Sequence, residues 1–347
     1  LAQAKARVDA PYEVGYHDER VRYRNWLSSI NNDSGAWLKA GVSPKMFEMS
    51  NNEFVSAICR RNTVEDPTIP KYTEFISRED PLMFRCSCEG SSRPKRVDPY
   101  GYHLVGCKIG ANAIRLHDEV VAMVAKLFRS LRLDAIVEPL RLFSDVDEDA
   151  SNQRPDIFIR NPRGLGRQVI IDVAVTGVDG QSRSNDEATE RPLQARYDQK
   201  MAKYGRIAEQ SNLLFVPAVF SHTGQIHGDF KAFVREQIKQ KLVAFEGDAK
   251  PSKTRSTMKW WSKCISMAIA KTASRNVAFK VAKMREAIME GQDELLMRNS
   301  GQTEGGLEAN NAAFLEDVAQ NADLYIANQG GSCLLYTSPS PRDMWTS

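Results

Sequence analysis

The chain has 347 residues and a formal net charge of +3, with 47 Lys and Arg against 44 Asp and Glu. This near balance gives no argument for nucleic-acid binding from overall charge, so any such signal must be local. Its length allows two domains, and hydrophobic residues make up 42% of it. No apolar run reaches membrane-spanning length and no signal-peptide pattern is present, so no membrane partner is expected. Six cysteines are too few for a disulfide framework in a chain this long.

Residues 1–80 are predicted to be mostly helical. Residues 19–27, ERVRYRNWL, are amphipathic, and residues 34–40, SGAWLKA, form a short apolar patch. Ser50 followed three residues later by Glu53 is typical of a capping box at a helix N-terminus. The helical pattern ends at three prolines, which are Pro67, Pro70 and Pro81.

A cluster of metal-ligand residues follows in residues 81–111. Cys86, Cys88, His103 and Cys107 form the pattern C-x-C, fourteen residues, H-x-x-x-C. Three thiolates and an imidazole satisfy tetrahedral Zn²⁺, and the turn-rich segment between the two pairs suits a small structural site. The alternative is three unrelated cysteines and a surface histidine. The sequence favours Zn²⁺.

Residues 112–247 alternate between helical and strand patterns. Apolar residues at helical spacing predict the first helix, and turn residues separate short apolar strands. The expected elements are a helix at 113–131, strands at 134–139, 155–160 and 167–175, a helix at 188–210, a strand at 213–220 and a helix at 230–242. This order predicts an α/β fold, with helices layered on a sheet.

Two carboxylates interrupt the apolar strands of this region. Asp172 lies in the middle of VIIDVAV, and Asp156 opens the preceding run RPDIFI. A buried carboxylate is costly unless something compensates its charge, and a divalent cation such as Mg²⁺ is the usual reason for acids to converge on a sheet. The alternative is that Asp156 caps a strand and Asp172 pairs with a nearby arginine.

The helix after these strands supplies cationic side chains. Lys200, Lys203 and Tyr204 in QKMAKY are spaced so that they share one helix face. A lysine beside a phosphate bound by a metal ion can orient the attacking water and neutralise charge in the transition state. An ordinary solvated helix face is the alternative for this motif taken alone.

A basic segment follows Gly247. Residues 248–256 are predicted to be a linker, and residues 258–290 a basic helix. About ten basic residues surround Trp260 and Trp261, and phosphate neutralisation with aromatic stacking suits nucleic acid, whether single-stranded or duplex. This interpretation selects Lys259, Trp260, Trp261 and Lys263. The alternative, compatible with it, is an amphipathic helix that packs its aromatic and aliphatic stripe on the α/β region.

The two ends of the sequence carry their own expectations. Residues 291–332 are acidic and rich in Gly, Asn and Gln, which predicts a flexible tail. Residues 333–347 resemble the translation of a sequencing-library adapter and are interpreted as an artefact, with a natural Ser/Pro tail as the alternative. The first residue is Leu1 instead of Met, as expected of a fragment of a longer reading frame.

The ordered set of motifs resembles a known family. CSC, then DPYGYHLVGC, RLHD, RPDI, IIDVAVT and KMAKY resemble the carboxy-terminal region of non-long-terminal-repeat retrotransposon proteins. In that region a CCHC zinc knuckle precedes a restriction-endonuclease-like domain of the PD-(D/E)XK class. The resemblance covers about residues 85–245, and residues 1–80 look like the linker upstream of it. It implies a mixed sheet flanked by helices, with helical segments on either side and a small zinc knuckle.

Residue by residue, the resemblance implies Mg²⁺ ligands at Asp156 and Asp172 and a catalytic lysine at Lys200 or Lys203, with Tyr204 beside it. In the general class the catalytic lysine follows the second acid by two residues, where this chain has Ala174. The retrotransposon branch is similar to this chain in that its lysine comes from the following helix. Glu119 is a candidate third acid. The branch usually has adjacent Arg and His, which Leu116 separates here, so the transfer of Arg115 and His117 is not made.

The resemblance implies a Mg²⁺-dependent endodeoxyribonuclease that nicks target DNA for target-primed reverse transcription. Its partners would be target DNA, the element RNA and a reverse-transcriptase domain upstream in the parent polyprotein, and its location the nucleus. The competing hypothesis is a catalytically inactive, nucleic-acid-binding fragment of a decayed element that uses the knuckle and the basic helix. The two acids and both lysines are intact, which favours the enzyme.

Overall fold

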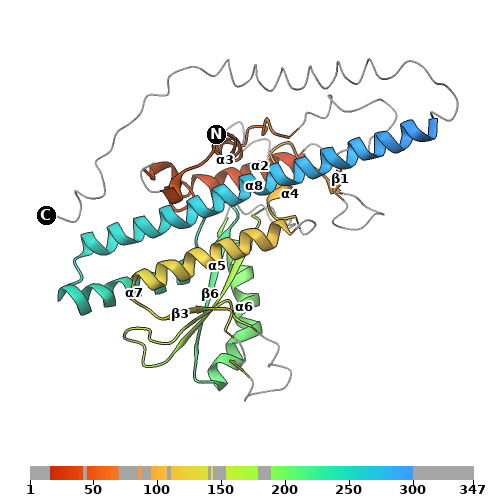
Figure 1. Cartoon of the computed structure of the whole chain (residues 1–347). Helices are drawn as coiled ribbons and strands as arrows, with labels where there is room; N and C mark the ends of the chain where they lie inside the picture. Colours follow the sequence, from red (N-terminus) through yellow and green to blue (C-terminus); the bar gives the residue numbers. More distant parts are fainter. Residues whose placement is uncertain are drawn as a thin grey trace. The chain divides into compact units, whose positions relative to one another are not determined.

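The computed structural model describes residues 16–41, 45–69, 85–86, 95–107, 111–139, 142–143, 154–178 and 189–299. For residues 16–20, 85–86, 95–96 and 287–299 it describes the backbone alone. Within these ranges the chain is a mixed α/β protein with seven α-helices, two 3-10 turns, a four-stranded mixed sheet and a short two-stranded hairpin (Figure 1).

The helices and strands alternate along the chain much as the sequence predicts. The amino-terminal part contains α2 (Tyr16–Ile30), η1 (Ala36–Lys39), η2 (Lys45–Phe47) and α3 (Asn51–Asn62). The hairpin and the short helix after it are β1 (Arg85–Cys86), β2 (Lys95–Arg96) and α4 (Tyr102–Val105). The remaining elements are α5 (Asn112–Ser130), β3 (Ala135–Val137), β4 (Ile157–Ile159), β5 (Val169–Thr176), α6 (Glu190–Gln210), β6 (Leu214–Ser221), α7 (Gly228–Glu246) and α8 (Pro251–Asn299).

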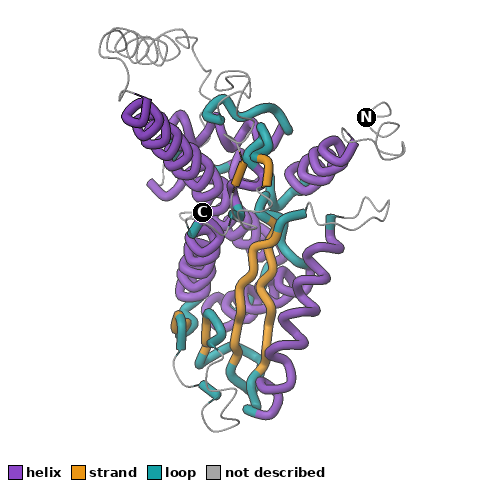
Figure 2. The backbone as a smooth tube through the Cα atoms, turned by 90° about the vertical axis from the view of Figure 1, so that its right-hand side faces the viewer, coloured by secondary structure: helices purple, strands orange, loops and turns teal. Residues whose placement is uncertain are grey.

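The sheet has the strand order β3-β4-β5-β6. The first three strands pair antiparallel, whereas β5 and β6 pair parallel over their full length. Figure 2 shows the two long strands of the sheet side by side. A parallel pair needs a crossover, and α6 provides it. Pro217 lies within β6, where it is tolerated because β6 is the edge strand of the sheet. On its free side the described structure has one isolated bridge, between Phe220 and Ile226, away from Pro217.

Each face of the sheet is covered by different helices. Side chains alternate along a strand, so Ile170 and Ala174 of β5 lie on one face, where both belong to apolar clusters completed by α6. On the opposite face, Phe220 of β6 packs edge-on against Phe230 of α7, and Phe230 in turn contacts Phe128 of α5. The strands are buried on both faces, which explains their nearly continuous apolar sequences.

The amino-terminal helices confirm the predicted helix signals. The Glu53 amide donates to Ser50 Oγ (3.3 Å) and the Ser50 amide donates to Glu53 Oε2 (2.8 Å), so the capping box is complete. The turn after α2 is joined to the sheet region through Asp33, whose carboxylate accepts hydrogen bonds from Lys231 Nζ of α7 at 2.7 and 2.8 Å.

Helix α8 differs from the sequence expectation in length and in role. It begins at Pro251, inside the predicted linker, and continues to Asn299, beyond the predicted helix end at residue 290. Trp261 is 1% exposed and packs edge-on against Phe128 of α5, with 5.0 Å between ring centroids. Asn276 donates to the carbonyls of Val105 (3.1 Å) and Asn112 (2.7 Å). The amino-terminal half of α8 is therefore a core element.

Residues up to Ala282 belong to one compact unit, and Lys283–Ser347 to a second. Segments predicted from the sequence as separate regions, before residue 80 and after residue 247, pack together within the first unit through α3 and α8. Arg60 of α3, for example, donates to Ser274 Oγ of α8 at 2.6 Å. Of the helices that the structure describes, none is long and apolar enough to cross a bilayer.

The adjacent tryptophans of α8 give a matched test of this packing. Trp261→Ala removes a fully buried ring and should lower the free energy of unfolding by about 3–5 kcal/mol. Trp260→Ala removes a ring that is 40% exposed and should cost at most about 1 kcal/mol. Urea denaturation followed by circular dichroism measures both values. Equal costs for the two variants would contradict the placement of α8.

Candidate functional site

The antiparallel register of β4 and β5 brings the two aspartates side by side. Ile157 pairs with Ile171 and Phe158 with Ile170, so the register continued by one residue sets Asp156 opposite Asp172. Directly opposed residues on neighbouring strands point to the same face of a sheet. That face is the one covered by α6, because Phe158 and Ile170 belong to the apolar cluster that α6 completes.

Asp156 is fixed by backbone and side-chain donors. Its Oδ2 accepts a hydrogen bond from the Val173 amide at 2.6 Å, which ties the side chain to the strand that carries Asp172. The same oxygen lies 3.2 Å from Nε2 of His117, near the start of α5. The Asp156 carbonyl accepts from the Glu138 amide at 2.8 Å. Asp156 therefore has a defined orientation although its side chain is partly exposed.

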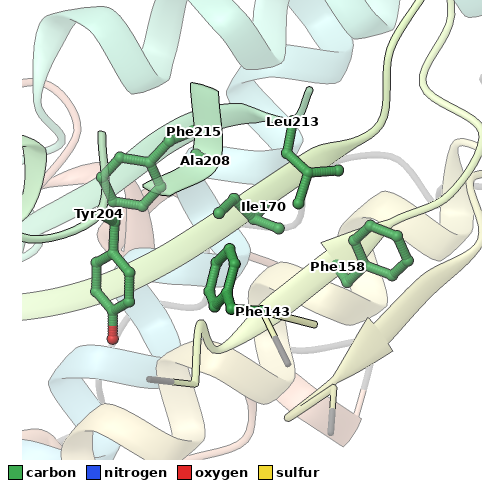
Figure 3. Close-up of a cluster of buried hydrophobic side chains, with 7 residues drawn as sticks. All are labelled: Phe143, Phe158, Ile170, Tyr204, Ala208, Leu213 and Phe215. Atoms are coloured by element: carbon green, nitrogen blue, oxygen red, sulfur yellow. The ribbon is translucent and has the colours of Figure 1, made fainter. Parts of the chain in front are cut away.

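Helix α6 directs Lys200 toward the pair because its core-facing residues recur at helical spacing. Leu193 packs with Ala174 of β5, and Tyr204 packs with Ile170 in the cluster drawn in Figure 3. Lys200 lies between Leu193 and Tyr204 on this face, just as Asp172 lies between Ala174 and Ile170 on the strand. Lys200 Nζ forms an ion pair with Asp172 Oδ2, and both side chains are largely buried.

Burial raises the pKa of Asp172, and the negative charge of Asp156 raises it further. Lys200 opposes both effects through its charge and its hydrogen bond, and Lys203 adds a smaller effect in the same direction. The Asp172 carboxylate thus lies in a poorly solvated place beside another acid. Such a group gains from any additional cation that reaches it.

Tyr204 links the cluster to the rim of the site. Its ring is buried among apolar side chains, and its hydroxyl lies at the edge of the cluster (Figure 3). The hydroxyl donates to the Arg154 carbonyl at 3.1 Å and accepts from Lys203 Nζ at 2.9 Å. Burial, followed by the nearby Asp172 carboxylate, raises the pKa of Tyr204, so the phenol stays protonated. Lys203 itself is exposed.

His117 also contacts this pair of acids, through Asp156, although its motif did not predict this. Its Nδ1 lies 3.1 Å from Oδ1 of Asp118, so the ring is held between two carboxylates. The hydrogen bond that the His117 ring donates to Asp156 is the main cause that raises the pKa of His117 to about 9, and burial opposes it. The signal available in the sequence was the position of His117 within RLHD, at the beginning of a helix followed by the sheet.

Two other residues of α5 are not brought to the aspartates. Arg115 Nε donates to Asn276 Oδ1 at 3.2 Å, and its guanidinium lies over the ring of Phe279, so it contacts α8. Glu119, the candidate third acid, is exposed two residues after His117, about 200° around the helix. The described structure gives Glu119 no contact with Asp156 or Asp172, and the residue of α5 that contacts Asp156 is His117.

The two aspartates fit a divalent cation. The described residues contain no ready-made cluster of three or more His, Cys, Asp or Glu ligands. Mg²⁺ does not need one, because it commonly binds through one or two carboxylates and completes its shell with water and substrate phosphate. Oδ2 of Asp172 is buried and, apart from the ion pair with Lys200, has no hydrogen-bond partner in the described residues. A cation bound between the aspartates would therefore share this oxygen with Lys200.

The predicted zinc knuckle lies only partly within the described residues. Cys88 and the side chain of Cys86 lie outside them. His103 lies on α4, whose amino-terminal amides are capped by the Asp98 carboxylate, and Cys107 is buried just after this helix. Cys86 ends β1, whose pairing with β2 forms the hairpin before α4. The Zn²⁺ assignment stays a prediction.

The predicted nucleic-acid-binding residues of α8 separate into two environments. Trp261 is in the core, so no base can stack on it. Lys259 and Trp260 are exposed, and Lys263 is partly exposed. Trp261 therefore packs in the core, as the amphipathic-helix interpretation predicted. Nucleic-acid binding stays a prediction for Lys259, Trp260 and Lys263.

Searches with protein-family models and against curated protein sequences found no match to this chain.

The environment of His117 gives a pH prediction that needs no metal. A pKa raised to about 9 means that the ion pair stabilises the fold fully below pH 6.5, the pKa of an exposed histidine, and that this stabilisation is lost as the pH rises through about 9. NMR titration of the His117 ring should show this pKa in the native chain. In Asp156→Asn it should fall toward 6.5. A pKa that is the same in both proteins would contradict the contact.

Proposed function

We propose that the chain is a Mg²⁺-dependent endodeoxyribonuclease. The observation that carries the proposal is the arrangement of Asp156, Asp172 and Lys200. The two carboxylates lie on the same face of the sheet. The Lys200 amine of the crossover helix lies between two apolar clusters and forms an ion pair with the Asp172 carboxylate. An ammonium group beside a pair of acids, with a rim that holds more cations, suits a phosphodiester that approaches from solvent.

Asp156 and Asp172 are the residues that would hold the cation. When bound there, a divalent cation neutralises charge on the scissile phosphate and lowers the pKa of an attacking water. Lys200 is the better candidate for the catalytic lysine because its amine is already directed at Asp172 and is shielded from solvent. A shielded ammonium stabilises charge that develops on a phosphate oxygen more strongly than an exposed one does.

The other side chains position this centre. The Tyr204 hydroxyl holds the Arg154 carbonyl, which precedes Asp156 by two residues, and it also contacts the Lys203 amine. Lys203 is thereby placed at the rim, where it can bind a phosphate before hydrolysis. His117 holds Asp156 from the other side and balances its charge. Hydrolysis adds water across one phosphorus–oxygen ester bond and requires no oxidant or reductant.

The fold supports a finer proposal. The order α5, β3, β4, β5, α6, β6 is a helix, three antiparallel strands, a crossover helix and a parallel strand, with Asp172 on β5 and Asp156 immediately before β4. We propose that this is a restriction-endonuclease-like domain of a retrotransposon protein that nicks target DNA for target-primed reverse transcription. The motif order from the cysteines to KMAKY supports this proposal. By the same resemblance we propose a Zn²⁺ knuckle and a nuclear location. The proposed partners are the element RNA and an upstream reverse transcriptase.

Cleavage of supercoiled plasmid in Mg²⁺ tests the proposal. Asp172→Asn and Asp156→Asn preserve shape but remove a charge, and each should slow nicking by at least about 100-fold, more than the loss of an outer-shell partner of a metal. Lys200→Gln should also slow nicking. The matched control is Asp134→Asn, because Asp134 is an exposed acid at the start of β3 that pairs with Arg160 away from the site. It should nick like the native chain.

Other results have definite meanings. Equal nicking by the native chain and Asp172→Asn would overturn the catalytic assignment. Retention of DNA by a native chain that never nicks would support the competing hypothesis of a binding fragment from a decayed element.

A further inference from the structure

The first turns of α8 present a face that the hydrolytic site does not use. Between Lys250 and Ala282 the sequence has eight Lys or Arg and no Asp or Glu. Trp261, Met258 and Cys264 turn into the core, which leaves the opposite side of this part of the helix toward solvent. The residues on that side are Ser252, Arg255, Ser256, Lys259, Trp260 and Lys263, and we call them the α8 face.

The cations of the α8 face form a row. Arg255, Lys259 and Lys263 follow one another at intervals of four residues, so they lie along one ridge of the helix about 6 Å apart. None of the three forms an ion pair with a described residue, whereas the neighbouring Lys253 and Arg275 are paired with Glu246 and Glu53. The row is therefore uncompensated positive charge.

Trp260 lies beside this row with its ring held in place. It is 40% exposed, and its ring meets Phe47 of η2 edge-on, with 5.2 Å between centroids. Phe47 is itself buried, so it supports Trp260 without covering it. Two acids form hydrogen bonds with this part of α8: Asp33 accepts from Ser262 and Glu246 from Lys253. Asp33 is buried and paired with Lys231. Neither acid has a described ion pair with Arg255, Lys259 or Lys263.

We infer that the α8 face binds single-stranded nucleic acid. Uncompensated cations in a row attract successive phosphates, and a fixed, exposed indole offers a platform for one base. An unpaired base can reach such a platform, whereas the bases of a duplex are stacked inside the helix. Single-stranded DNA and RNA share this chemistry, and the inference does not depend on hydrolysis at Asp156 and Asp172.

Fluorescence anisotropy of the full chain in buffer without magnesium tests the inference independently of cleavage. The probes are labelled oligothymidylate, oligouridylate and a DNA hairpin duplex of equal length. The native chain should bind at least one single-stranded probe more tightly than the duplex. Preference between the thymidylate and uridylate probes identifies the natural strand as DNA or RNA.

The variants separate stacking from charge. Trp260→Ala should weaken single-strand binding by about 5- to 150-fold, the range for loss of one stacked base, and leave the salt dependence unchanged. Trp260→Phe should retain most of the affinity. Lys259→Gln with Lys263→Gln should reduce the salt slope by about 1.4, because each phosphate contact contributes about 0.7 on a single strand.

Phe54→Ala is the matched control. Phe54 is an aromatic side chain that is 48% exposed and meets the buried Trp37 edge-on, as Trp260 meets Phe47, but it lies on α3 beside an acid. It should leave binding unchanged. The inference is overturned if Trp260→Ala binds like Phe54→Ala, or if the duplex binds as tightly as both single strands.

Discussion

The placement of one carboxylate in an otherwise apolar layer organises this protein. Asp172 lies in the middle of β5, and it has an acid, Asp156, for its cross-strand neighbour. A buried carboxylate without a partner is strongly unfavourable, and loss of one member of a buried ion pair typically costs about 3–5 kcal/mol. Lys200 compensates the charge of Asp172 through their ion pair. This ion pair forms only if the strand register and the position of the crossover helix bring the two side chains together.

The same residues build the core and the proposed site, and the topology explains why. The parallel pairing of β5 and β6 requires a crossover, and α6 lies along the face that carries both aspartates. A residue on the core side of α6 at the level of Asp172 is necessarily close to it, and this residue is Lys200. Tyr204, one turn later, fills the apolar cluster with its ring while its hydroxyl holds the backbone that leads to Asp156. Core and site are thus not separable in this fold.

The sequence predicted the helices and strands well where the spacing of apolar residues, or a local capping motif, clearly favours one kind of element. The apolar spacing of α5, the apolar runs of β5 and β6 and the capping box of α3 depend on local chemistry, and the structure confirms them. It predicted the pairing of Asp156 with Asp172 because a short segment rich in turn residues, residues 160–168, joins their strands. It could not choose between Lys200 and Lys203, since both lie on one broad helix face and only tertiary packing separates the shielded amine from the exposed one. For the same reason it did not distinguish Trp260 from Trp261 or place His117 at Asp156. These outcomes depend on which neighbour covers each face.

The most direct test of the account is the position of a divalent cation relative to the two strands. Crystals of the chain grown or soaked with Mn²⁺, a stand-in for Mg²⁺ that scatters anomalously, would show the ion in an anomalous difference map. If the two aspartates hold the cation, a peak is expected about 2.0–2.5 Å from one oxygen of Asp156 and one oxygen of Asp172. A well-ordered site with no peak between these carboxylates, or with the two side chains on opposite faces of the sheet, would contradict it.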